Sequence, residues 1–217
     1  NNTTGDNNTA VGAYALDANT TGSGNVALGE SALSSNSTNS DSTAIGYGSL
    51  TSSTGPSNTA LGKSALGTLS TGSYNTAVGH NALVLATTAD YNNAVGHNSM
   101  FSTTTGQKNC AMGNESLEAN TTGSWGVAIG HQALEANTTA NYNVALGFAA
   151  LKATTTGGQN VAVGGEAMEL NTTGDSNTAV GMRALEVNTT ASYNTAIGHN
   201  ALESNTTADG NTGCGAK

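Results

Sequence analysis

Apolar and polar positions alternate along this chain in a pattern that returns at a fixed spacing. A Thr or Val, an Ala and a larger aliphatic residue precede a glycine, and an Ala-Leu pair follows that glycine three residues later, as in "NTAVGHNAL" at 75–83. The stretch "SYNTAVGHNAL" at 73–83 returns at 192–202 with Val78 changed to Ile197 as its only difference. The chain therefore consists of internal repeats.

The glycine of this pattern marks the period. It occurs at Gly12, Gly29, Gly46, Gly62, Gly79, Gly96, Gly113, Gly130, Gly147, Gly164, Gly181, Gly198 and Gly215. Every interval is 17 residues except the 16 between Gly46 and Gly62. A fixed period near 20 through a whole chain is the signature of a repeat architecture.

The consensus, N-T-A-V-G-x-x-A-L-x-x-N-T-T-G-x-x, divides into one strand and several turns, and we number its positions 1 to 17. Thr, Val and Ile before a glycine are typical of a short strand, whereas N-T-T-G suits turns and left-handed backbone. The Ala-Leu pair is a second apolar step, for which a short helical turn is the alternative. We predict an all-β fold, a parallel β-solenoid or β-roll of about 13 coils with a 17-residue period.

The domain organisation follows from the same period. Residues 1–217 form a single repeat array, and both ends fall inside a repeat, so we expect a segment of a longer fibre. The coil at 46–62 is one residue short and carries Pro56, so we expect a bend or bulge there.

The strand pattern also predicts an oligomer. Adjacent residues of a strand face opposite sides of a sheet, so Ala77 and Val78 cannot both enter one core. If both are buried, one face closes the coil and the other meets a second chain. With few large side chains per coil, the core of a lone chain is thin, and we expect a homo-oligomer, in particular a parallel homotrimer.

Composition narrows the function classes. Aromatic residues are 4% and charged residues 9% of the chain, and the net charge is −9. The few cations are scattered, so we expect no nucleic-acid partner. No apolar run approaches a membrane span, so the chain is not itself membrane-spanning.

The repeats "NTAVGHNAL", "NTAIGHNAL" and "NVALGESAL" resemble the YadA-like head repeats of trimeric autotransporter adhesins, and equally the repeat segments of phage tail fibres. The resemblance covers all the repeats. It implies a left-handed, trimeric parallel β-roll with small residues inside each roll and aliphatic residues between chains, serving as a stalk or binding a host surface. The period of 17 is longer than is usual in that family, so the additional residues are expected in the "NTTG" loop.

Aromatic residues are the first candidate binding group, because they recur at two positions of the repeat. Position 17 of one repeat and position 6 of the next carry them together, six residues apart: Tyr74 with His80, Tyr91 with His97, Trp125 with His131, Tyr142 with Phe148, and Tyr193 with His199. One interpretation is ring stacking across a turn. The other is an aromatic strip for sugar binding, and both can hold.

Metal binding and catalysis have little support. The four histidines occupy position 6, which elsewhere holds Ala13, Glu30 or Lys63, so we expect no metal and no cofactor. An acidic column after Leu or Met is interpreted as a solvated edge; it comprises Glu118, Glu135, Glu169, Glu186 and Glu203. No known catalytic motif is present, and we predict that the chain is not an enzyme.

The asparagine of N-T-T, or of N-S-T at Asn36, fits the N-glycosylation sequon. The candidates are Asn2, Asn19, Asn36, Asn120, Asn137, Asn171, Asn188 and Asn205. A separate asparagine column at position 1, as in Asn58 and Asn75, is expected to hydrogen-bond side chain to side chain along the stack. The adjacent threonines of N-T-T do not give the T-x-T arrangement of an ice-binding surface.

No disulfide is predicted. Cys110 and Cys214 lie six coils apart, which at about 4.8 Å per coil is beyond the reach of a disulfide.

These observations together favour a structural or adhesive fibre segment on a cell or virion surface, extracellular and without catalysis. Its partners are copies of itself and a host surface glycan or protein. The alternative is a self-assembling extracellular filament protein, with or without glycans on the sequon asparagines.

Overall fold

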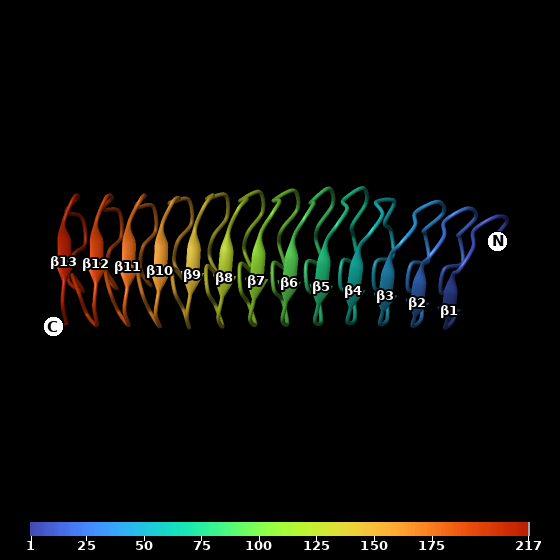
Figure 1. The fold of residues 1–217 in the computed structure, drawn as a ribbon, viewed down its shortest axis with the longest axis horizontal. Coiled ribbons are helices and arrows are strands. Elements are labelled where there is room, and N and C mark those ends of the chain that lie inside the picture. The colour runs from blue at the N-terminus through green and yellow to red at the C-terminus, as the bar shows by residue number, and fades with distance from the viewer. Residues whose placement is uncertain (217) are drawn as a thin grey trace. The chain divides into compact units, whose positions relative to one another are not determined.

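The computed structural model describes residues 1–216 and shows an all-β chain, a solenoid of parallel strands with a period of about 17 residues (Figure 1). Each repeat contributes one three-residue strand. The strands are β1 (Thr9–Val11), β2 (Val26–Leu28), β3 (Thr43–Ile45), β4 (Thr59–Leu61), β5 (Thr76–Val78), β6 (Asn93–Val95), β7 (Cys110–Met112), β8 (Val127–Ile129), β9 (Val144–Leu146), β10 (Val161–Val163), β11 (Thr178–Val180), β12 (Thr195–Ile197) and β13 (Thr212–Cys214). The predicted β-solenoid and its period are confirmed.

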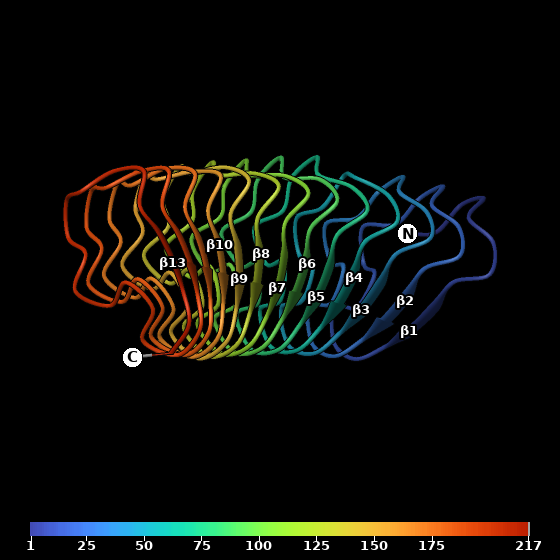
Figure 2. The same ribbon diagram turned by 60° about the vertical axis from the view of Figure 1, so that its left-hand side comes forward.

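The chain divides into two compact units. The first comprises Asn1–Lys108 and holds β1–β6, and the second begins at Asn109 and holds β7–β13. We call one 17-residue repeat, beginning at position 1, a rung, and number each rung by its strand. Within each unit the rungs lie over one another as nearly identical loops (Figure 2).

Strands of neighbouring rungs pair in parallel and one repeat apart. In the second unit, for example, Val127 pairs with Val144 and Ile129 with Leu146. The hydrogen bonds run both ways: Val144 N donates to Asn160 O of the next rung, and Gly147 N donates to Ile129 O of the previous one, both at 2.8 Å. Each rung is thus held by the rungs on either side of it.

The glycine at position 5 ends each strand because no other residue fits there. At Gly164, φ is +133°, and a Cβ would lie 2.6 Å from the carbonyl carbon and oxygen of Gly181 in the next rung. Side chains rarely adopt this φ, and real Cβ atoms do not approach backbone so closely. The same overlap occurs at Gly79 and Gly130, which explains why the glycine recurs in every rung.

The stretch after this glycine forms two tight turns, and the alternative of a short helical turn is not formed. In rung 5, Ala82 N donates to Gly79 O and Ala86 N to Leu83 O, each at 3.3 Å. Leu83 has a left-handed φ of 54°, as do the Leu and Met residues at position 9 of other rungs. This reverses the direction of the chain and lets Ala82 and Leu83 both point inward, where both are fully buried.

The interior is a set of columns, one per repeat position. The alanine of each strand from β2 to β12 is fully buried, and so are the alanine, leucine or methionine residues of the turns, such as Leu134 and Met168. The residues on either side of the strand alanine point outward: Ala77 is buried, whereas Val78 is half-buried. The predicted alternation is therefore confirmed, with alanine inside and the larger aliphatic residue outside.

The short rung at 46–62 keeps its strands in register. Thr43 pairs with Thr59 and Ile45 with Leu61. The missing residue falls at position 14, in the turn, where Thr54 N donates to Ser70 O at 2.5 Å. The turn before Pro56 therefore takes up the deletion, and the sheet of the first unit continues past it.

Candidate functional site

The outer face of the sheet carries an exposed apolar column, which we call the aliphatic stripe. It consists of the position 4 side chains, which in the second unit are Met112, Ile129, Leu146, Val163, Val180 and Ile197, followed by Cys214. Ile197 is 46% exposed, and Leu28 of the first unit is equally so. Position 2, on the same face, adds Val127, Val144 and Val161. An exposed apolar face that runs along successive strands is typical of an interaction surface.

Aromatic side chains at position 17 stack along the solenoid, from rung to rung. The rings of Tyr74 and Tyr91 lie 5.0 Å apart and 7° from parallel. Trp125 and Tyr142 in the second unit repeat this geometry at 5.0 Å and 9°. These rings remain half exposed, so the column presents aromatic surface to solvent.

Position 6 forms a second column, at the other end of the strand. His80 stacks on His97 at 5.4 Å, and His131 on Phe148 at 5.8 Å. Other side chains form the column in rungs without His or Phe. For example, the ammonium group of Lys63 lies over the ring of Tyr47, with Nζ 5.9 Å from the ring centre.

Stacking of Tyr74 on His80 across a turn was the wrong interpretation of this pairing. Tyr74 precedes β5 and His80 follows it. The three extended residues of the strand alone separate the two side chains by about 10 Å. The rings stack instead on the equivalent rings of the neighbouring rungs. The two columns therefore border the face that carries the aliphatic stripe.

The position 1 asparagines form the expected ladder. Asn75 Nδ2 donates to Asn58 Oδ1 at 3.1 Å, and Asn194 Nδ2 donates to Asn177 Oδ1 at 3.1 Å. These side chains are buried, and each also donates to a backbone carbonyl, as Asn75 does to Ala89 O. The buried amides are thereby satisfied, which is required inside a protein.

The sequon asparagines form a second interior ladder that the sequence did not reveal. Asn137 Nδ2 donates to Asn120 Oδ1 at 2.9 Å, and Asn188 Nδ2 donates to Asn171 Oδ1 at 2.8 Å. Six candidates lie in the interior with at most 2% exposure: Asn19, Asn36, Asn120, Asn137, Asn171 and Asn188. Because the amide nitrogen that a glycan would occupy is buried and already donating, glycosylation at these six positions is incompatible with the folded chain. Asn2 is exposed and Asn205 half-buried.

The threonine after each sequon asparagine also serves the stack. Thr121 Oγ1 donates to Thr138 O at 3.0 Å, and Thr138 Oγ1 donates to Thr155 O at 3.1 Å. These hydroxyl groups therefore bind the next rung.

Acidic side chains gather at two places on the turn edge of the second unit. Carboxylate oxygens lie within 4.8 Å of one another in the group Glu115, Glu118 and Glu135 and in the group Glu166, Glu169 and Glu186. Cations lie beside them: Lys152 Nζ is 3.5 Å from Glu135, and Arg183 Nε is 2.6 Å from Glu166. The hydrogen bond that Arg183 donates to the Glu166 carboxylate, together with the negative charge of Glu166, raises the pKa of Arg183 above its usual value. Such exposed pairs offset the carboxylate repulsion and contribute little more.

Cys110 and Cys214 are free thiols at opposite ends of the second unit, at the start of β7 and the end of β13. Both occupy outward positions of their strands, positions 2 and 4.

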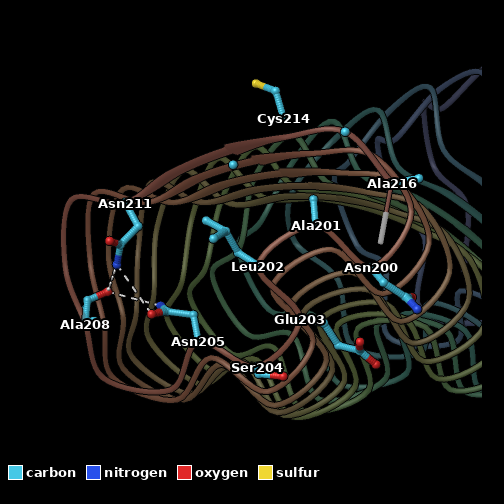
Figure 3. Close-up of a pocket in the computed structure, with 12 residues that line it drawn as sticks. Asn200, Ala201, Leu202, Glu203, Ser204, Asn205, Ala208, Asn211, Cys214 and Ala216 are labelled. Carbon is cyan, nitrogen blue, oxygen red and sulfur yellow. Dashed lines mark hydrogen bonds between the residues drawn. The ribbon is translucent and has the colours of Figure 1, made fainter.

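A pocket of about 550 Å³ lies at the last rung (Figure 3). Leu202 points into its interior and Cys214 points away from it. Asn211 Nδ2 donates to Ala208 O at 2.9 Å at its margin, and Asn205 donates to the same carbonyl at 3.1 Å. The walls of this pocket are residues of the interior columns of the solenoid. The pocket therefore presents the same kinds of side chain that pack between rungs elsewhere.

The described residues include no helix long and apolar enough to cross a membrane. The chain matches no known protein family, and no curated protein is significantly similar to it.

Proposed function

We propose that the chain is a structural and adhesive segment of a homotrimeric fibre on a cell or virion surface, without a catalytic role. One observation carries this proposal: the aliphatic stripe lies outside the solenoid along every strand from β1 to β12. Burying apolar surface stabilises association by about 25 cal/mol per Å². The stripe is therefore the surface on which copies of the chain are proposed to meet.

The arrangement of the remaining side chains supports a structural role. The interior amides and the position 13 hydroxyls hydrogen-bond along the stack. A solenoid of this kind gains stability from each interface between neighbouring rungs. A rigid support that displays surface side chains at regular intervals is what an adhesive fibre requires.

Sedimentation equilibrium of the chain tests the proposal. The expected mass is three times the 21.3 kDa of one chain. Replacing Ile129→Lys and Val163→Lys puts two charges on the stripe and is expected to give monomers. The control carries the same charges on exposed turns, Thr122→Lys with Thr190→Lys, and is expected to remain trimeric.

Two results would count against the proposal. A folded wild-type monomer would remove the interface. A mass that rises continuously with concentration would favour the alternative, a self-assembling filament.

A further inference from the structure

We propose that a groove between Tyr142 and Tyr193 binds a short, neutral oligosaccharide. This inference rests on the proposed adhesive function and names its ligand class. The groove has a volume of about 380 Å³, within the range of small-molecule sites. It is formed by the turns that precede β9 to β12 and contains no strand residue; its lining includes Asn141, Gln159, Asp175 and Ser176 between the two tyrosines.

The two tyrosines form the ends of the groove because the position 17 column is interrupted. Rungs 8 to 11 carry Tyr142, Gln159, Ser176 and Tyr193 at this position. Three rungs at about 4.8 Å each place the two tyrosines about 14 Å apart along the stack. Stacked rings need a centroid distance of about 4.5 Å, so the gap holds two flat rings, one against each tyrosine.

Neither tyrosine has an aromatic neighbour at position 17 on the side of this gap. Trp125 covers one face of Tyr142, and the opposite face is turned toward the next rung, where Gln159 replaces an aromatic residue. Tyr193 is 70% exposed. One face of a pyranose ring carries only C–H groups, which pack against the negative face of an aromatic ring. The tyrosines thus match the apolar faces of sugar rings.

The polar side chains between the tyrosines are fixed on one side and free on the other. Asn141 Oδ1 accepts from Ser124 N at 2.8 Å, Gln159 Oε1 accepts from Ser176 Oγ at 3.2 Å, and Asp175 Oδ1 accepts from Gly158 N at 2.6 Å. Within residues 1–216 the other amide or carboxylate atom of each has no hydrogen-bond partner. Two amide donors and one carboxylate acceptor are therefore held ready for sugar hydroxyls.

The charge of the groove selects among sugars. Asp175 is its single charged side chain, and no Lys or Arg lines it. A sialic or uronic acid would place a second carboxylate near Asp175 without a cation to pair with it, which opposes binding. The ligand class is therefore a neutral oligosaccharide.

Position 17 does not require an aromatic residue for folding. Gly24, Lys108 and Ser176 occupy it in other rungs with the same left-handed φ. The tyrosines of the groove can thus be replaced without loss of the fold. Tyr91 of the first unit is a matched control, because its ring stacks directly on Tyr74.

The experiment uses the fluorescence of Trp125, the single tryptophan of the chain, which stacks on Tyr142. The full chain is titrated with chitotriose, cellotriose and, as an acidic comparison, 3′-sialyllactose. At least one neutral trisaccharide is expected to change the fluorescence saturably. Tyr193→Ala is expected to weaken binding about tenfold, the loss of one stacked ring, whereas Tyr91→Ala leaves the affinity within about twofold.

Three results would overturn the proposal: no saturation with either neutral trisaccharide at millimolar concentration, unchanged affinity in Tyr193→Ala, or tighter binding of 3′-sialyllactose. Circular dichroism of each variant verifies the fold. The outcome is separable from that of the fibre proposal. A trimer that binds no trisaccharide retains the structural role alone, and a monomer whose sugar binding depends on Tyr193 retains the groove without the fibre.

Discussion

Single residues of the repeat are fixed by the rung next to them. Gly164 has no room for a Cβ because the backbone of Gly181 lies against its Cα, whereas Gly165, the next residue, has only Phe148 O at 4.0 Å from such a Cβ. Position 5 therefore requires glycine because the backbone of the next rung leaves no room for a side chain. Position 6 accepts other residues.

Gly164→Ala is expected to lower the free energy of unfolding by about 3 kcal/mol or more, because the added methyl group overlaps backbone and φ is +133°. Gly165→Ala is the control and is expected to change stability by less than about 0.5 kcal/mol. Thermal unfolding followed by circular dichroism measures both. Equal effects of the two substitutions would contradict the rung-to-rung contact.

In the second unit the sequon ladder is interrupted at one residue. Thr154 takes the place of an asparagine, and Asn137 Oδ1 in the rung before it is buried without a hydrogen-bond partner in the described part of the chain. Asn171 Nδ2 reaches Thr154 Oγ1 only at 3.4 Å. The interruption leaves an unsatisfied buried acceptor, which is costly.

Thr154→Asn is expected to raise the free energy of unfolding by about 1 kcal/mol, because its amide donates to Asn137 and accepts from Asn171. The neighbouring Thr155→Asn removes a hydroxyl that donates to Thr172 O and is expected to give no gain. Chemical denaturation of the two variants decides the point, and a gain from Thr155→Asn alone would refute the ladder.

At the scale of the element, each three-residue strand separates an alanine interior from an aliphatic exterior. Leu134, in the following turn, is fully buried, whereas Ile129, at the end of β8, is 39% exposed. Two similar side chains five residues apart therefore have different tasks, one in the core of the chain and one on its outer face.

Leu134→Ala is expected to lower the free energy of unfolding by about 3 kcal/mol at any protein concentration, since it leaves a cavity inside the chain. Ile129→Ala is expected to act through association, so its effect on the unfolding midpoint should be largest at high protein concentration and shrink as the protein is diluted into single chains. Melting curves over a range of concentrations distinguish the two. An effect of Ile129→Ala that equals that of Leu134→Ala at every concentration would place both residues in one core.

The sequence predicted these elements where the period alone decides them. The spacing of Gly79 and Gly96 fixed the strands, the pleat placed Ala77 and Val78 on opposite faces, and the column of Asn58 and Asn75 formed the expected ladder. The sequence did not predict the features that depend on the backbone conformation of single residues. The left-handed φ of Leu83 brings two adjacent side chains inside, and no composition rule anticipates this for leucine.

The same limit explains the errors at the candidate site. Position along the chain suggested that Tyr74 stacks on His80, but an extended strand separates them, and each ring meets its copy one rung away. The N-T-T asparagines fit a surface sequon, yet Asn120 and Asn137 turn inward because neighbouring rungs offer them hydrogen-bond partners. Contacts between rungs, which short sequence motifs do not encode, decided both cases.

The whole molecule combines an interior whose asparagine side chains hydrogen-bond from rung to rung with an outer face that leaves aliphatic side chains exposed. Identical chains that meet on identical faces form closed symmetric assemblies. In a parallel trimer each rung meets the same rung of the other copies, so the aliphatic stripe packs on itself along its length. The turns that form the oligosaccharide groove remain outside this contact, because they contain no strand residue.

Double electron–electron resonance tests this packing most directly. Spin labels are placed at Val144→Cys, or separately at Thr178→Cys, in a chain with Cys110→Ser and Cys214→Ser. A parallel, in-register trimer predicts a short inter-chain distance that is the same at both positions. A short distance at one position with a long distance at the other, or no inter-chain coupling at all, would contradict it.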